Sequence, residues 1–362
     1  MKKICLFVIT LIIVLLFPFN CYADNDFDSV YDIVPDDVKD VFSESEYELK
    51  SIQDVINIIS NDGLFSLIKI AFSNYSLPLK TITSLLLLSV LSVSLQIIIE
   101  KPETKKMAQI ISSLILCILL AEPLKNIIIS VTECLNSSGI FMFSFLPIFA
   151  SFLITSSPTT SAIAYTSTIY FFTELTVFIS KSVLTPLSTF LFTMSVVSSV
   201  SDGIFNNLLG GIKKLIIWTL GLVTTIFTAV TSVQSIITSA ADSVAIRTGK
   251  FVVGSSVPVV GGYISEVMNT VIGSVSIMRS GIGLFAIIIM IIMFLPVIVE
   301  LLLWKVGLKF CQMITFGTDN EISINIINSF DDVISVMLSI IICVFIGMIL
   351  SISAILVFGG VK

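Results

Sequence analysis

Long intervals without a charged residue constrain this chain more than any other feature of its sequence. Residues 134–173, 215–241, 280–299 and 333–361 contain no Asp, Glu, Lys or Arg. A membrane-spanning helix needs about 20 mostly apolar residues, so each interval can hold one span and the first can hold two. Charged residues make up 12% of the chain, about half the share in soluble domains. We therefore predict an all-α, polytopic integral membrane protein with about 7-8 transmembrane helices, and not a soluble, disordered or nucleic-acid-binding protein.

Charge divides the chain into two unlike regions. Residues 24–62 carry 12 acidic and two basic residues, whereas 13 acidic and 15 basic residues follow from position 63 onward. Near the N-terminus, two lysines precede an apolar run that ends in Cys21-Tyr22-Ala23, which is typical of a secretory signal peptide. We predict a signal peptide over 1–23, or else an uncleaved anchor helix. An acidic, helical extracytoplasmic segment follows over 24–76, acting as a partner contact or a solvated connector, and a multi-span membrane domain occupies 77–362.

The membrane domain divides into spans at its charged and proline-containing connections. We expect spans near residues 81–99, 107–129, 139–156, 160–180, 183–200, 215–237, 284–304 and 333–358. Seven spans also fit the pattern. Basic residues are almost evenly shared between the two sides, so the orientation depends on the signal peptide rather than on the connections.

The stretch 238–283 is apolar enough to enter the bilayer, yet glycines and a proline interrupt it. Broken helices at membrane depth need their backbone groups satisfied by protein or by a water-filled cavity, so such a segment can line a pathway. Two interfacial amphipathic helices joined by a surface loop fit the stretch equally well. The candidate pathway or packing residues are Arg247, Gly249, Lys250, Gly254, Pro258, Gly261 and Gly262.

Ionisable residues inside spans are costly and are therefore functional candidates. Glu174 is the first, with Lys181 about two helical turns further along, and Glu122 beside Pro123 is the second. Glu300 lies near a span end, where snorkelling toward Lys305 explains it. The chain contains no histidine, and its six cysteines are scattered. We predict no enzyme activity, no metal site and no cofactor.

Several short motifs cluster between positions 232 and 262. They are Ser232-Val233-Gln234, Ala240-Ala241-Asp242, Arg247-Thr248-Gly249-Lys250-Phe251, Gly254 and Pro258-Val259-Val260-Gly261-Gly262. This run resembles the signature of the stage III sporulation protein AE family. The order of signal peptide, acidic helical segment and multi-span domain is also similar to that family.

The resemblance implies a membrane component of the stage III A complex in the mother-cell membrane around the forespore. It implies other stage III A proteins and the forespore's stage II sporulation protein Q as partners in a channel that acts after engulfment. The alternative is an autonomous secondary transporter coupled through Glu122 or Glu174. A purely structural scaffold without a pore is a third possibility. Besides protein partners we expect contact with the lipid bilayer and none with nucleic acid.

Overall fold

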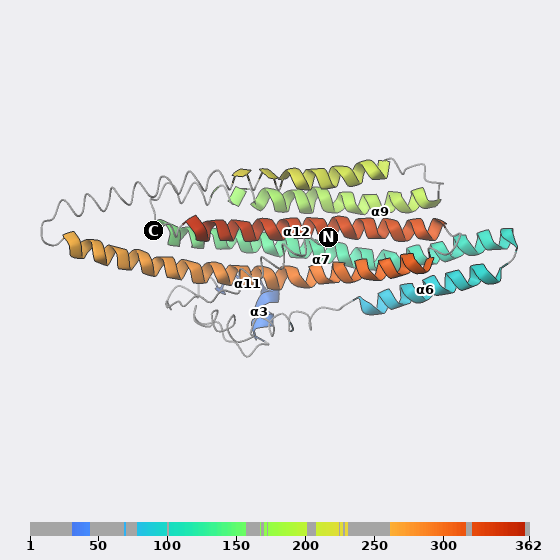
Figure 1. The fold of residues 1–362 in the computed structure, drawn as a ribbon, viewed down its shortest axis with the longest axis horizontal. Helices are drawn as coiled ribbons and strands as arrows, with labels where there is room; N and C mark the ends of the chain where they lie inside the picture. The colour runs from blue at the N-terminus through green and yellow to red at the C-terminus, as the bar shows by residue number, and fades with distance from the viewer. Residues whose placement is uncertain are drawn as a thin grey trace.

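The computed structural model describes an elongated bundle of helices (Figure 1). The described residues are 31–43, 69, 78–99, 101–156, 167, 170–171, 173–200, 208–223, 225–226, 229–230, 261–315 and 321–358. Within these ranges there are helices and no β-strand, which confirms the all-α prediction. The expected signal peptide and most of the acidic segment lie outside the described residues.

The long helices of the bundle run close to its long axis, and the short α3 (Asp36–Ser43) is steeply inclined to it (Figure 1). The other labelled elements are α6 (Leu79–Ile98), α7 (Pro102–Ser156), the π-helical turn η1 (Ser180–Leu184), α9 (Thr185–Val200), α11 (Gly261–Thr315) and α12 (Glu321–Phe358). A further helix without a label covers residues 208–223. In the described part of the chain, five helices are long and apolar enough to cross a membrane, as in a multi-pass membrane protein.

The core of the bundle is the pair α11 and α12, which pack against each other more extensively than any other two elements. In the most apolar part of α11, 67% of the residues are buried, against 22% in α6. A helix that is apolar on all sides belongs in the interior, and the stretch 284–304 of α11 is almost entirely apolar. α11 is thus the central helix and α6 a peripheral one.

Three large aromatic side chains connect α9, α11 and α12. The Trp304 and Phe330 ring centroids lie 5.6 Å apart, and those of Phe192 and Phe330 lie 5.7 Å apart, both in edge-to-face geometry. Such pairs stabilise more than their buried area alone. The cluster therefore fixes the register of α9 and α11 against α12.

α7 is continuous where the sequence analysis expected two spans, 107–129 and 139–156, with a connection between them. It contains 55 residues and is about 82 Å long, so a hydrocarbon core of about 30 Å covers less than half of it. The polar stretch 133–139 contains no proline, and its side chains find partners both within α7 and on neighbouring helices. Ser138 donates to the Leu135 carbonyl oxygen, and Asn136 accepts a hydrogen bond from Lys181.

α11 likewise extends through residues that were expected to belong to a broken segment. Its backbone is helical from Gly261 onward and continues without interruption into the stretch 284–304. No proline occurs between Gly261 and Pro296, and isolated glycines weaken a helix without ending it. The part of segment 238–283 that precedes Gly261 lies outside the described residues.

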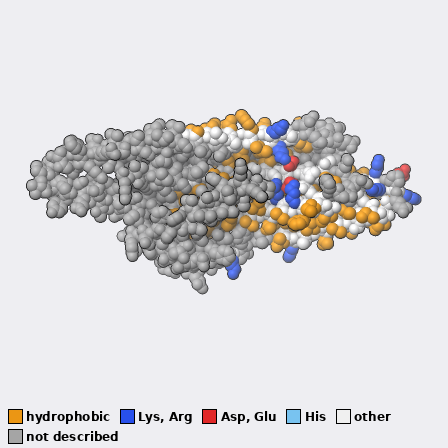
Figure 2. All heavy atoms as spheres, viewed as in Figure 1, with side chains coloured by type: hydrophobic (Ala, Val, Ile, Leu, Met, Phe, Trp, Pro, Cys, Tyr) orange, Lys and Arg blue, Asp and Glu red, His pale blue; other side chains and the backbone are white. Residues whose placement is uncertain are grey.

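A group of oppositely charged side chains, here called the ion-pair cluster, joins three helices. Its members are Lys213, Lys305, Lys309, Asp331 and Asp332. Asp331 of α12 lies 3.5 Å from the Lys305 ammonium and 3.1 Å from that of Lys309 on α11, and Asp332 pairs with Lys213. Figure 2 shows basic and acidic side chains side by side on an otherwise mostly uncharged described surface. These charges compensate one another and hold helix 208–223 and α11 against α12.

Candidate functional site

A polar cleft opens between α7 and α11 and is the most distinctive site in the described part of the molecule. Its volume is about 1020 Å³, and α3 and the first residues of α6 complete its walls. The side chains that give it its character are Lys80, Thr81, Glu122, Asn126, Ser130, Glu133, Ser137 and Glu300. We call it the acidic cleft.

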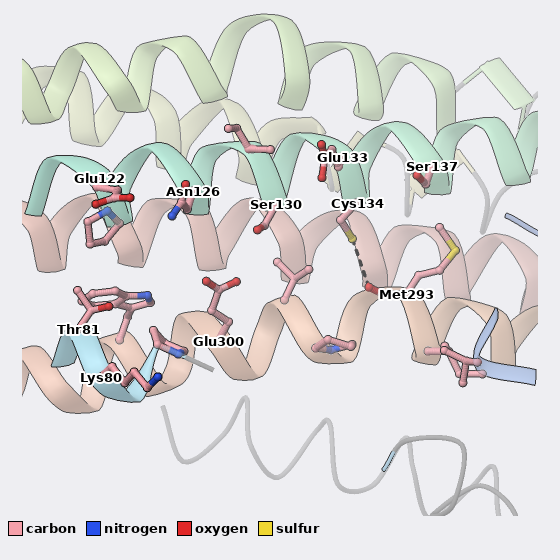
Figure 3. A pocket seen from close by; sticks show the side chains of 18 of the residues that line it. Lys80, Thr81, Glu122, Asn126, Ser130, Glu133, Cys134, Ser137, Met293 and Glu300 are labelled. Atoms are coloured by element: carbon pink, nitrogen blue, oxygen red, sulfur yellow. Dashed lines mark hydrogen bonds between the residues drawn. The ribbon is translucent and has the colours of Figure 1, made fainter. Parts of the chain in front are cut away.

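One face of α7 supplies a polar stripe along the acidic cleft. The stripe consists of Glu122, Asn126, Ser130, Glu133 and Ser137, spaced four, four, three and four residues apart. Residues at this spacing share one face of a helix, so the five side chains follow the cleft over about four turns. Figure 3 shows them in this order along the α7 ribbon.

Glu300 faces this stripe from the opposite helix. Its side chain rises from α11 toward α7 (Figure 3), and the residue is only 7% exposed. Cys134 of α7 donates to the Met293 carbonyl oxygen at 3.6 Å, which joins the two helices about two turns away from Glu300. The acidic cleft therefore lies within the packed interface between α7 and α11.

Each of these two helices carries a proline in the cleft wall. Pro123 of α7 and Pro296 of α11 both line the cleft. Proline has no N–H, so the carbonyl groups of Leu119 and Ile292, one turn earlier, lose their helical donor. Leu119 and Ile292 also line the cleft. Backbone freed in this way within a membrane is tolerated where it meets protein or water.

The balance of charges around the cleft is negative. Asp40, Glu122, Glu133 and Glu300 line it together with a single basic residue, Lys80. A concave surface lined by one sign of charge concentrates ions of the opposite sign. The arrangement suits water, protons or cationic groups and disfavours anions.

Of the two carboxylates singled out from the sequence, the structure places only Glu122 in the cleft. Glu174 is half-buried on the helical stretch 173–179 and does not line it. Lys181, expected along the same face as Glu174, instead donates to Asn136 of α7 at 2.7 Å. Lys181 is the second residue of the π-helical turn η1, and the residues from Glu174 to η1 are α-helical.

The expected pairing of Glu300 with Lys305 is wrong. Lys305 contacts Asp331 and Ser335 of α12, while Glu300 faces the cleft. Five residues along an α-helix turn through about 140° beyond a full turn, so these two side chains leave α11 on different sides.

The candidate segment contributes nothing to the cleft in the described part of the chain. Arg247, Gly249, Lys250, Gly254 and Pro258 lie outside the described residues. Gly261 and Gly262 are the first residues of α11. They are about 45 Å along the helix from Ile292, the first residue of α11 that lines the cleft.

Sequence reasoning missed Asn126, Ser130, Glu133 and Ser137 as a group. A signal was present, because polar residues recur at three- and four-residue intervals through an apolar stretch. The contribution of Glu300 could not be found in this way, since its role depends on which helix packs opposite α7. Within the described ranges, no three His, Cys, Asp or Glu side chains are grouped so as to hold a metal ion.

Comparison with known proteins gives a consistent relationship. The profile of the family described as "Stage III sporulation protein AE (spore_III_AE)" matches residues 44–359. The chain is also similar to stage III sporulation protein AE of Bacillus subtilis (strain 168), with 23% identity over 216 residues. That alignment covers 59% of this chain and 54% of the relative, so it spans about half of the relative's length. No solved structure matches the chain. Because the family profile covers most of the sequence, this chain belongs to the stage III sporulation protein AE family.

Proposed function

We propose that this protein is a non-enzymatic membrane subunit of a sporulation-specific transport complex that links mother cell and forespore after engulfment. The observation that carries the proposal is the family match over residues 44–359, which supports a role in sporulation. This is not a known enzyme family. We place the chain in the mother-cell membrane around the forespore, with its N-terminal segment extracytoplasmic.

The proposed complex contains other stage III A proteins and, from the forespore side, stage II sporulation protein Q. Two features of the bundle agree with a subunit role. The helices on its periphery, such as α6, bury few of their residues and are free to meet lipid or other subunits. The acidic cleft supplies a polar surface inside an otherwise apolar domain. Either a conduit or a scaffold for one fits these features.

Deletion of the gene in its source organism tests the proposal, with microscopy of growing and sporulating cells. We expect normal vegetative growth, complete engulfment and arrest of forespore development afterwards. A copy of the intact gene should restore spore formation. Normal spores from the deletion strain would contradict a role in this complex.

A second candidate, an autonomous secondary transporter, is favoured by one observation. The acidic cleft holds Glu122, Glu133 and Glu300 within the apolar helices, and such carboxylates serve coupling in many transporters. The two candidates differ in their dependence on partners. A transporter should move its substrate when the purified chain alone is reconstituted in vesicles, whereas a subunit of a complex should be inactive alone.

A further inference from the structure

A second groove lies between α7 and α9, on a different part of the bundle from the acidic cleft. Its volume is about 660 Å³. Hydroxyl side chains dominate its lining, with one lysine among them: Thr132, Lys181, Ser182, Thr185, Thr189 and Thr193. We call it the hydroxyl groove.

The threonines of the hydroxyl groove are held close to their own helices. Thr189 and Thr193 donate to the carbonyl oxygens of Thr185 and Thr189, and Thr132 of α7 donates to that of Ile128. Their polar atoms are thus satisfied within the helices, and most side chains that line the groove are short, with Ile128, Lys181 and Phe190 as the larger ones. Small and hydroxyl-bearing side chains allow another helix to approach closely inside a membrane.

Lys181 gives this groove a positive charge at the middle of a span. The described helical residues around it run without a break from Thr173 through η1 and α9 to Val200, so Lys181 lies at least eight residues from either end of this stretch. That distance is about 12 Å, and snorkelling serves lysines closer to helix ends. The Lys181 side chain is exposed, and η1 places it at the groove. π-Helical turns of this kind are frequent at functional sites.

The partner that the structure gives Lys181 is uncharged. Its ammonium donates to the Asn136 side-chain oxygen at 2.7 Å, and among the described residues it forms no ion pair. The lysines of the ion-pair cluster, Lys213, Lys305 and Lys309, are each paired with an aspartate. An ammonium in the middle of a span is costly without a carboxylate beside it, and the described part of the chain supplies none to Lys181.

We propose that the hydroxyl groove binds a membrane-spanning helix of another protein that carries an Asp or Glu near its midpoint, paired with Lys181. This inference deepens the proposed function, on which it rests, by naming a subunit surface and the chemistry of its partner. A second copy of the chain fits less well, because a twofold axis along the membrane normal would bring two Lys181 side chains to the same depth. Lipid chains would leave the ammonium without a counter-charge.

Site-specific photo-cross-linking in sporulating cells tests the groove itself. A p-benzoylphenylalanine at Thr189, inside the groove, should form an adduct with a spanning segment that contains an acidic residue, identified by mass spectrometry. The same probe at Leu87 of α6, which is 71% exposed and outside the groove, should not yield this adduct. Adducts with lipid alone, with a second copy, or with a segment lacking an acidic residue would overturn the proposal.

Substitutions of Lys181 test whether its positive charge pairs with the acidic residue of the partner helix. With the Thr189 probe in place, Lys181→Glu should reduce the adduct roughly tenfold or more, because two carboxylates would face each other, whereas Lys181→Arg should retain it. Replacing the partner's acidic residue by lysine should restore the adduct of the Lys181→Glu variant. An adduct that is insensitive to Lys181→Glu, at an equal amount of chain in the membrane, would overturn the role of Lys181.

The cross-linking result can also be distinguished from the test of the proposed function, because cross-linking reports contact between two helices and not the yield of spores. A groove adduct in cells whose deletion mutant sporulates normally would contradict the proposed function while supporting the docking surface. Arrested sporulation in the deletion mutant without a groove adduct would do the reverse.

Discussion

The acidic cleft and the ion-pair cluster are two polar regions of one apolar bundle, and they differ in their balance of acidic and basic side chains. In the ion-pair cluster, both aspartates of α12 have lysines as partners, and Asp331 has two. In the acidic cleft, four acidic residues share the walls with Lys80 alone. Glu300 and Lys305 belong to these different regions although only five positions separate them on α11. Opposite charges paired between helices stabilise packing, whereas carboxylates that line a cavity lie within reach of a ligand or of water.

The largest effect should come from breaking the ion-pair cluster at its centre. Asp331→Leu removes the carboxylate that faces Lys305 and Lys309, and the Asp331 and Lys305 side chains are mostly buried. Removing one partner of a buried pair costs about 3–5 kcal/mol, because the remaining charge is uncompensated. We expect a large loss of folded protein, measured as the amount of chain in the membrane and its melting temperature in detergent.

A second change serves as the control for Asp331→Leu. The double variant Asp331→Leu, Lys305→Met removes both a negative and a positive charge and should recover part of the lost stability. If the double variant is less stable than Asp331→Leu alone, the ion pair is not what Asp331 contributes.

A smaller effect is expected at the contact that holds α6 beside the acidic cleft. A Cβ atom on Gly307 of α11 would lie 2.6 Å from Cγ2 of Ile82, next to the cleft residue Thr81. Gly307→Ala should therefore destabilise the bundle by about 1–3 kcal/mol through overpacking. Gly210→Ala is the matched control, because a Cβ there meets no atom within 4 Å. Equal melting temperatures for the two variants would show that α6 does not approach α11 this closely.

Loss of a single neutral hydrogen bond between helices should lower the free energy of unfolding less than Asp331→Leu or Gly307→Ala does. Ser113 of α7 and Ser323 of α12 are both buried, and their hydroxyl oxygens lie 2.8 Å apart. Hydrogen bonds of this kind inside membranes contribute about 0.6 kcal/mol. Ser113→Ala should lower the free energy of unfolding by about that amount, and adding Ser323→Ala should lower it by little more. Fully additive losses in the double variant would contradict a direct bond.

A substitution in the acidic cleft should have the smallest effect on stability. It should differ most from the substitution of Asp331. Glu122 is exposed to the cleft, so Glu122→Gln should change the free energy of unfolding by less than about 0.5 kcal/mol. Spore formation should nevertheless fall if the cleft carries function. Measuring spore yield together with the amount of membrane-bound protein separates the two effects. A normal yield would assign Glu122 to the protein surface alone.

Parts of the acidic cleft could be predicted from the sequence, and parts could not. Glu122 was a candidate because a carboxylate within an apolar helix is costly wherever the helix packs. The α7 stripe from Glu122 to Ser137 follows from helical periodicity once α7 is known to be continuous. Glu174 was the stronger candidate from sequence and lies outside the cleft. Lys181, its expected neighbour, instead donates a hydrogen bond to Asn136 of α7.

The sequence by itself determined that this protein is a bundle of apolar helices. That result needs only local information, because a membrane-spanning chain must satisfy its backbone hydrogen bonds internally and needs about 20 apolar residues to cross. Tertiary structure decided the partner of each charged side chain. Lys305 pairs with Asp331, Lys181 donates to Asn136, and Glu300 faces the polar stripe of α7. It also decided that α7 continues through residues 133–139, where Asn136 accepts a hydrogen bond from Lys181 of η1. These outcomes depend on the rotation and register of helices distant in sequence, which the periodicity of one helix does not contain.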